Sequence, residues 1–261
     1  MKLLSKSRGG LVALLALAWS ATPAVAQDDA TLDLLYEIDL LGAVFNAFTP
    51  FPWTEEENQA SYLYADTKNT IRHLLVENGR TRELWKSFPL EGSVREVFAE
   101  DLDGNGRLEI IAFTTGARIY VWDTDTQYTL KWESIEERFE TISAMAIADV
   151  DRDPALELIA VADNVITYYD GKEFFREKAG RDVMDPQRIL IADVDGDLTD
   201  EIVTSDGYVL DTTSLSIEWA TDSFGYPIEL FDIDDDGILD LVAERGGALQ
   251  FWSIKDRREI W

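Results

Sequence analysis

The sequence predicts an all-β fold, and three observations lead to this prediction. An acidic stretch followed by an apolar run occurs four times along the chain. The segments around each copy alternate apolar and polar residues and are rich in Val, Ile, Tyr and Trp, which favours strands over helices. Short turn sequences such as "TTGAR" and "SDG" separate those segments. Units of about 35 to 50 residues with four strands each are typical of a β-propeller, and five such units fit the chain.

The repeated stretch is a ladder of acidic residues at alternate positions. Its four copies begin at Asp101 ("DLDGNGRLEII"), Asp149 ("DVDRDPALELIA"), Asp193 ("DVDGDLTDEIV") and Asp232 ("DIDDDGILDLV"), with spacings of 48, 44 and 39 residues. A fifth, eroded copy starts at Asp66, and its ladder is broken. Each unit is expected to form a strand, the acidic loop, a strand, a turn, a strand, a turn and a strand. The predicted fold is therefore a single β-propeller of five four-stranded blades.

The chain is expected to divide into three parts. Residues 1–26 are typical of a secretory signal peptide, because a basic start and the short apolar run "LVALLALAW" precede small residues. We therefore expect export to the periplasm or the extracellular space. Residues 27–59 are expected to form a separate extension, either an amphipathic helix or an extended strap. The propeller is expected over 60–261, with repeats over 60–90, 91–138, 139–184, 185–223 and 224–261.

Composition excludes several classes of function. The formal net charge is −28, with 51 acidic and 23 basic residues. Nucleic acids and anionic membranes repel such a chain, and no segment after the signal peptide is long and apolar enough to span a bilayer. The absence of cysteine excludes disulfides and thiolate nucleophiles. The charge favours cations or basic partners instead.

The acidic stretches carry oxygen ligands at regular positions. With the first Asp as position 1, oxygen-bearing side chains fall at positions 1, 3, 5 and 9, and the carbonyl of position 7 can add one more oxygen. Calcium takes roughly six to eight oxygen ligands, whereas magnesium keeps its waters and zinc prefers Cys and His. We therefore predict up to four structural Ca²⁺ ions. The predicted ligands are Asp101, Asp103, Asn105, Arg107 and Glu109; Asp149, Asp151, Asp153, Ala155 and Glu157; Asp193, Asp195, Asp197, Thr199 and Glu201; and Asp232, Asp234, Asp236, Ile238 and Asp240.

The four copies resemble FG-GAP/VCBS repeats, the calcium-loop repeats of propellers like those of integrin α-subunits. This resemblance covers about 200 residues and implies calcium in the loop between the first two strands of a blade. It also implies an exported protein that acts in adhesion, ligand binding or assembly. The sequence departs from the family pattern at position 9, which is Glu in three copies, and at position 6, which is Pro154 and Leu198 in two. A need for positive φ at position 6 would favour the loops with Gly237 and Gly106, so we rank the Asp232 loop first and the Asp101 loop second.

No catalytic constellation is found, and the chain is predicted not to be an enzyme. The single histidine, His73, lies in the apolar stretch "IRHLLV", where a structural role is expected. Without Cys and with one His, the common pairs of nucleophile and base are nearly excluded. The alternative is a lyase or hydrolase site on the face opposite the calcium loops.

A protein partner is expected to bind the opposite face, where the longer connections between repeats gather. The predicted partner-binding residues are Arg138, Phe139, Arg181, Met184, Phe224 and Tyr226. The leading hypothesis is an exported binding or assembly platform. A calcium-dependent carbohydrate-binding module is the alternative, because an aromatic residue such as Trp132 or Trp219 closes most repeats. Packing between blades is the competing interpretation of these aromatic residues.

Overall fold

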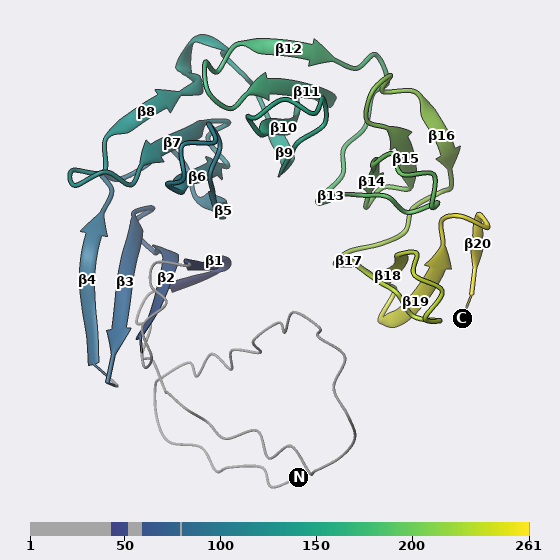
Figure 1. The fold of residues 1–261 in the computed structure, drawn as a ribbon, viewed down its shortest axis with the longest axis horizontal. Helices are drawn as coiled ribbons and strands as arrows, with labels where there is room; N and C mark the ends of the chain where they lie inside the picture. Colours follow the sequence, from purple (N-terminus) through teal and green to yellow (C-terminus); the bar gives the residue numbers. More distant parts are fainter. Residues whose placement is uncertain (1–42, 52–58, 79, 261) are drawn as a thin grey trace, which may run out of the picture. The chain divides into compact units, whose positions relative to one another are not determined.

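The computed structural model describes residues 43–51, 59–78 and 80–260. Within them, every regular element is a strand except one short 3-10 helix, η1 (Ser134–Glu136). The strands form five four-stranded antiparallel sheets, and in each sheet the strands follow their order in the chain (Figure 1). This arrangement is consistent with a five-bladed β-propeller, so the predicted fold class is confirmed. The described residues fall into two compact units, divided between Pro89 and Leu90.

The first unit holds one sheet, built from β1 (Ala43–Phe51), β2 (Gln59–Asp66), β3 (Ile71–Glu77) and β4 (Arg80–Lys86). β1 pairs antiparallel with β2, so the expectation that all of 27–59 stands apart from the propeller is wrong for this part. Pairing gives β1 a hydrogen-bonded partner that an isolated strap would lack. The expected signal peptide, residues 27–42 and residues 52–58 lie outside the described residues.

The eroded acidic copy is not equivalent to the other four. Asp66 ends β2 and is followed by β3, the second and third strands of its sheet. Its carboxylate accepts the Lys68 and Thr70 N–H groups at 2.8 and 3.1 Å and pairs with Arg72 Nε at 2.9 Å. Burial opposes ionisation, but the hydrogen bonds from Thr70 and Arg72 outweigh it and lower the pKa of Asp66 to about 2. Asp66 therefore caps a turn between the second and third strands of its sheet, whereas the other four copies join first and second strands.

The second unit holds the other four sheets, and each acidic stretch joins the first two strands of one sheet. In Figure 1 the sheets follow one another in chain order. Their strands are β5 (Val94–Glu100), β6 (Glu109–Thr114), β7 (Ile119–Asp123) and β8 (Leu130–Glu133); β9 (Ile142–Ala148), β10 (Glu157–Ala162), β11 (Val165–Asp170) and β12 (Arg176–Ala179); β13 (Ile189–Ala192), β14 (Glu201–Thr204), β15 (Tyr208–Asp211) and β16 (Ile217–Ala220); and β17 (Ile228–Phe231), β18 (Asp240–Arg245), β19 (Ala248–Ser253) and β20 (Arg258–Glu259).

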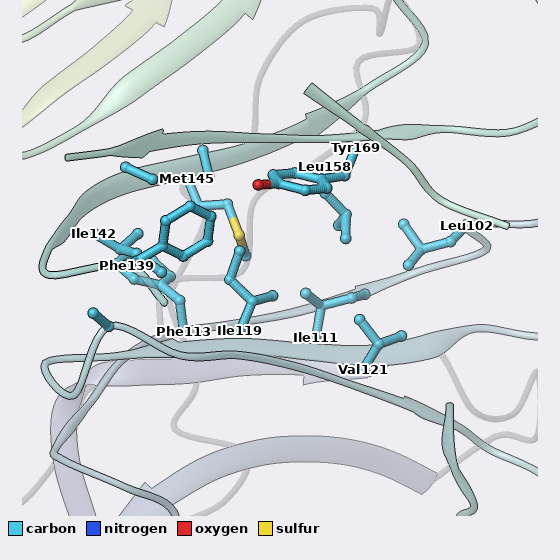
Figure 2. Packing of buried hydrophobic residues seen from close by; sticks show 13 residues of the cluster. Leu102, Ile111, Phe113, Ile119, Val121, Phe139, Ile142, Met145, Leu158 and Tyr169 are labelled. Carbon is cyan, nitrogen blue, oxygen red and sulfur yellow. The ribbon is translucent and has the colours of Figure 1, made fainter. Parts of the chain in front are cut away.

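The core of this unit lies between consecutive sheets. β6, β10 and β14 are buried along their whole length, and both faces of β10 and β14 pack against a neighbouring sheet. Figure 2 shows one such layer, in which Phe113 and Ile119 lie close to Met145. Trp132 stacks on Phe174 with ring centroids 5.3 Å apart. Packing between sheets is thus confirmed for this tryptophan.

Hydrogen bonds between loops define two ends of the second unit. At one end, Thr124 and Thr212, which follow third strands, donate to the Leu108 and Asp200 carbonyls of acidic loops, both at 2.7 Å. We call this the acidic end. At the other end, turns between second and third strands bind the connections between sheets, as Asp163 does when it accepts the Glu140 N–H at 2.8 Å. We call this the connection end.

An ion pair joins the first strands of sheets that are distant in the chain. Arg188, just before β13, donates to Glu96 of β5 at 2.6 Å, a contact between residues 92 positions apart. Its other terminal nitrogen lies 3.5 Å from Glu229 of β17. Burial raises the pKa of Glu96 above its usual range, against the effect of Arg188. Three sheets of the second unit therefore meet at one guanidinium group.

Candidate cation sites

The acid at position 9 closes each acidic loop at its base. This residue is the first of the second strand and is buried in every copy. Its carboxylate accepts the peptide N–H of position 2. The four bonds join Glu109 to Leu102 at 2.9 Å, Glu157 to Val150 at 2.8 Å, Glu201 to Val194 at 3.0 Å and Asp240 to Ile233 at 3.3 Å. Glu at position 9, which departs from the family pattern in three loops, thus makes the same hydrogen bond to the position 2 N–H as Asp240 does in the fourth.

The first Asp of each loop accepts peptide N–H groups from the far side of the turn. Asp101 binds the N–H of Asn105 at 3.0 Å and of Gly106 at 2.8 Å, and Asp232 repeats this pattern. Asp193 accepts the N–H groups of positions 4 and 6. In the remaining loop, Pro154 occupies position 6 and has no N–H to donate. Asp149 accordingly makes a single such bond, at 2.6 Å from the Arg152 N–H.

Positive φ is required at position 4 of all four loops and at position 6 of three. Position 4 has φ of 68° at Gly104, 68° at Arg152, 85° at Gly196 and 63° at Asp235. Position 6 has φ of 84° at Gly106 and Gly237 and 71° at Leu198. The expectation for position 6 therefore holds in three loops, with a strained backbone at Leu198. The requirement at position 4 was missed, although the glycines there were a visible signal.

Three carboxylates gather within 4.8 Å of one another in each loop, and such groups could hold a metal ion. The groups are Asp101, Asp103 and Glu109; Asp149, Asp151 and Glu157; Asp193, Asp195 and Asp197; and Asp232, Asp234 and Asp236. A further group joins Asp195 and Glu201 to Glu218 of β16, which the sequence analysis did not include. Asp153 and Asp240 belong to none of these groups.

The position 5 side chains brace the turn. Asn105, Asp153, Asp197 and Asp236 accept the peptide N–H of position 7, which is Arg107, Ala155, Thr199 or Ile238, at 2.6 to 2.9 Å. The predicted position 7 residues thus lie in the loops at the expected place. Their peptide N–H groups donate to the position 5 side chains, so their carbonyl oxygens are the atoms that could coordinate an ion.

Burial strongly perturbs the position 9 acids. It raises the pKa of Glu157 and of Glu201 to about 7, and neighbouring carboxylates such as Asp151 and Asp195 add to the effect. Glu157 is fully buried, and its Oε1 has no hydrogen-bond partner. A buried, unpartnered carboxylate oxygen is costly unless a cation or a proton neutralises it. The donor set of the Asp149 loop therefore fits a divalent cation.

The Asp101 loop already contains a cation. Lys131 of β8 places its Nζ 2.8 Å from Asp103 Oδ2 and 3.2 Å from Glu109 Oε1. Burial opposes ionisation of Asp103, but the hydrogen bonds from Lys131 and Asn105 and the charge of Lys131 outweigh it and lower the pKa. Lys131 was missed by the sequence analysis, because the acidic stretch and "LKWE" are separated by two strands.

The Asp193 loop borders a small cavity. A hollow of about 40 Å³ is lined by Asp195, Glu201 and Glu218, by Trp219, and by Lys255 and Arg257 of the next sheet. This volume is room for only a few water molecules or a partly hydrated ion. The cavity and the acids thus form a polar chamber between the loop and β16.

The residues predicted to bind a partner separate into two groups. Phe139, Met184 and Phe224 are buried in the clusters between sheets, so their prediction as surface contacts is wrong. They close the ends of the apolar layers, because each lies where the chain passes from one sheet to the next. Arg138, Arg181 and Tyr226 are exposed. Ile135 and Val183, 56% and 71% exposed on the same connections, were missed.

The closing tryptophan of the third sheet of this unit packs in the same way as Trp132. Trp219 lies against Phe224 and Trp252, with ring centroids 5.3 and 6.0 Å apart. Phe175, in contrast, is exposed. The two tryptophans therefore belong to the layers between sheets and are not exposed platforms for sugars.

His73 is buried in β3, as expected for a structural residue. Its Nε2 lies 2.5 Å from the hydroxyl of Ser61. Burial lowers the pKa of His73 to about 4, so the imidazole is neutral at physiological pH. A neutral imidazole between two strands stabilises their register through this hydrogen bond.

The fold and the acidic loops define this chain as an all-β, propeller-type repeat protein with several candidate cation sites. No protein-family model matches the sequence, and no curated protein matches it either. Many solved structures share the fold. Of the FG-GAP/VCBS resemblance, these comparisons support the β-propeller fold.

Three solved structures illustrate the similarity. Sqt1 from Saccharomyces cerevisiae matches with a TM-score of 0.60 at 11% identity, over 80% of this chain and 59% of that one. The V. cholerae biofilm matrix protein Bap1 matches with a TM-score of 0.55 at 17% identity, over 78% of this chain and 35% of Bap1. BBS1N, in complex with ARL6DN, matches with a TM-score of 0.58 at 12% identity, over 83% of this chain and 67% of that one. The chain thus spans about three fifths of Sqt1 and about a third of Bap1. In the part of the chain that the structure describes, no helix has the length and apolar character needed to cross a membrane.

Proposed function

We propose that this protein is an exported, non-enzymatic platform for protein binding or assembly, whose acidic loops hold structural calcium. The observation that supports the calcium sites is the gathering of three carboxylates within 4.8 Å in each of four loops. The similarity to the biofilm matrix protein Bap1 supports a role outside the cell. A propeller presents loops on a rigid scaffold, an arrangement suited to binding another protein.

Calcium would be held by the side-chain oxygens at positions 1, 3, 5 and 9, which are carboxylates except at Asn105. It would neutralise groups whose mutual repulsion destabilises the loops. Because the ion binds the folded loop and not the unfolded chain, it stabilises the fold by linkage. The loops themselves have no role in chemistry under this proposal. Trp132 and Trp219 pack between sheets, which favours protein binding over the carbohydrate alternative.

Calcium is expected to raise the melting temperature of the purified chain relative to a chelated sample by about 5 °C or more, and more than magnesium does. Differential scanning calorimetry measures the shift, and native mass spectrometry counts the bound ions. An unchanged melting temperature together with no bound calcium would contradict the calcium sites.

The protein partner is expected to bind the connection end, where Ile135 and Val183 expose apolar surface. The double substitution Ile135→Asp and Val183→Asp should abolish co-purification of a partner cross-linked in the native host. Phe175→Asp, at a 54% exposed site in the turn after β11 at the acidic end, is the matched control and should leave capture intact. Loss of the same partner with Phe175→Asp alone would place the binding surface at the acidic end and refute this assignment.

A further inference from the structure

One residue of the fourth strand occupies the same structural position in three sheets of the second unit. Pairing between the third and fourth strands skips a residue in each sheet, which marks a β-bulge. The skipped residues are Lys131 in β8, Glu177 in β12 and Glu218 in β16. A bulge turns its side chain away from the regular alternation, and this residue lies beside the acidic loop. The charge at this position is positive in one sheet and negative in two.

In the Asp101 loop, the bulge residue fills the space between carboxylates. Lys131 Nζ contacts Asp103 at 2.8 Å and Glu109 at 3.2 Å. Both acids belong to the group of three that lies within 4.8 Å. All three side chains are largely shielded from water, so screening is weak and the attraction is strong. The ammonium group therefore sits among the oxygens that a metal ion would need.

In the other two loops, the bulge residue adds negative charge. Glu218 joins Asp195 and Glu201 within 4.8 Å, beside the polar cavity. Glu177 acts electrostatically on Glu157 of the Asp149 loop. The fully buried Oε1 of Glu157 has no hydrogen-bond partner. This unpartnered oxygen is an observation independent of the clustering, and a bound cation would neutralise it.

We propose that Lys131 is the built-in cation of the Asp101 loop, which folds without a metal ion, whereas the loops facing Glu177 and Glu218 depend on a divalent cation. This inference rests on the proposed function, because it assigns the calcium ions to particular loops. The sequence analysis ranked the Asp101 loop second among the four calcium sites. This inference ranks its calcium affinity last, because an ion must first displace the ammonium group of Lys131. In the Asp232 loop, Lys255 lies 3.7 Å from Asp236 and both are half-exposed, a pair that contributes little. The wild-type chain should therefore bind three calcium ions.

The test exchanges the charge at the bulge position. Lys131→Glu should bind one calcium ion more than the wild type in native mass spectrometry. Without calcium, it should melt about 5 °C or more below the wild type, and calcium should restore the difference. Glu218→Lys should bind one ion fewer and melt higher than the wild type in chelator. Lys86→Glu is the matched control, because it makes the same charge change at an exposed site of β4 and should alter neither quantity.

Two outcomes would overturn the inference. One is a wild-type chain that binds four ions with Lys131 in place, and the other is a Lys131→Glu chain that behaves like Lys86→Glu. Lys131→Gln, which removes the charge and keeps most of the length, replaces Lys131→Glu if that variant does not fold. If no variant binds calcium, the proposed calcium function fails. The inference about Lys131 is then decided by the melting temperature of Lys131→Gln in chelator, which must fall below that of Lys86→Gln.

Discussion

Replacing Phe224 by alanine should lower the free energy of unfolding by about 3–5 kcal/mol. The ring is fully buried and contacts Trp219 and Trp252, with centroids 5.3 and 5.5 Å away. Its removal takes apolar area out of the core and leaves a cavity between two sheets that rigid strands cannot collapse to fill. Urea denaturation followed by tryptophan fluorescence measures the loss.

Tyr226 provides the matched control for this substitution. It lies two residues further along the same connection and is 44% exposed. Tyr226→Ala should change the free energy of unfolding by less than about 1 kcal/mol. Equal losses for the two variants would show that Phe224 is not the residue that closes this layer.

The metal-free protein should become less stable as the pH rises from about 4.5 to 7. The folded-state pKa values of Glu157 and Glu201 are raised from 4.5 to about 7, mainly by burial. Between these values the folded state binds more protons than the unfolded state, so the free energy of unfolding falls with rising pH. Each group contributes on the order of 2–3 kcal/mol. Urea denaturation of the metal-free chain at pH 5 and pH 7 measures the difference.

Calcium should reverse this dependence, because a bound cation favours the ionised carboxylates and is released when they are protonated. The double variant Glu157→Gln and Glu201→Gln is the control, since it keeps the hydrogen-bond acceptor to position 2 and cannot ionise. Its metal-free stability should depend much less on pH over the same range. An unchanged slope in the double variant would assign the effect to other acids.

The sequence predicts the propeller fold because its strongest signals are local and repeated. The acidic ladder, the apolar second strand such as "EIIAFT" and the following turn recur in the same order. Strands buried on both faces need continuous apolar runs, and tight turns need residues that tolerate positive φ. Position 4 has positive φ in all four acidic loops, but only two copies have glycine there. Arg152 and Asp235 occupy it in the other two, so the sequence pattern did not reveal the requirement.

Other features depend on tertiary placement and were not predictable from local patterns. The "YLYAD" stretch, which ends at Asp66, resembles a first strand, yet it belongs to the second, because β1 pairs beside it. Phe139, Met184 and Phe224 lie in polar connections, and composition alone does not distinguish an exposed contact from a residue that closes a core. The role of Lys131 depends on a β-bulge, and a bulge is defined by pairing between strands.

The contact between Arg188 and Glu96 makes this protein energetically different from an open array of repeats. In an open array, each repeat is stabilised by its immediate neighbours, and the ends can unfold one repeat at a time. Here one guanidinium group, 2.6 Å from an acid 92 positions earlier in the chain, forms its contact only when several sheets are in place. Closing so long a segment has an entropic cost that must be met before the contact forms. We therefore expect the ion pair to form late in folding and to couple the sheets of the second unit to one another.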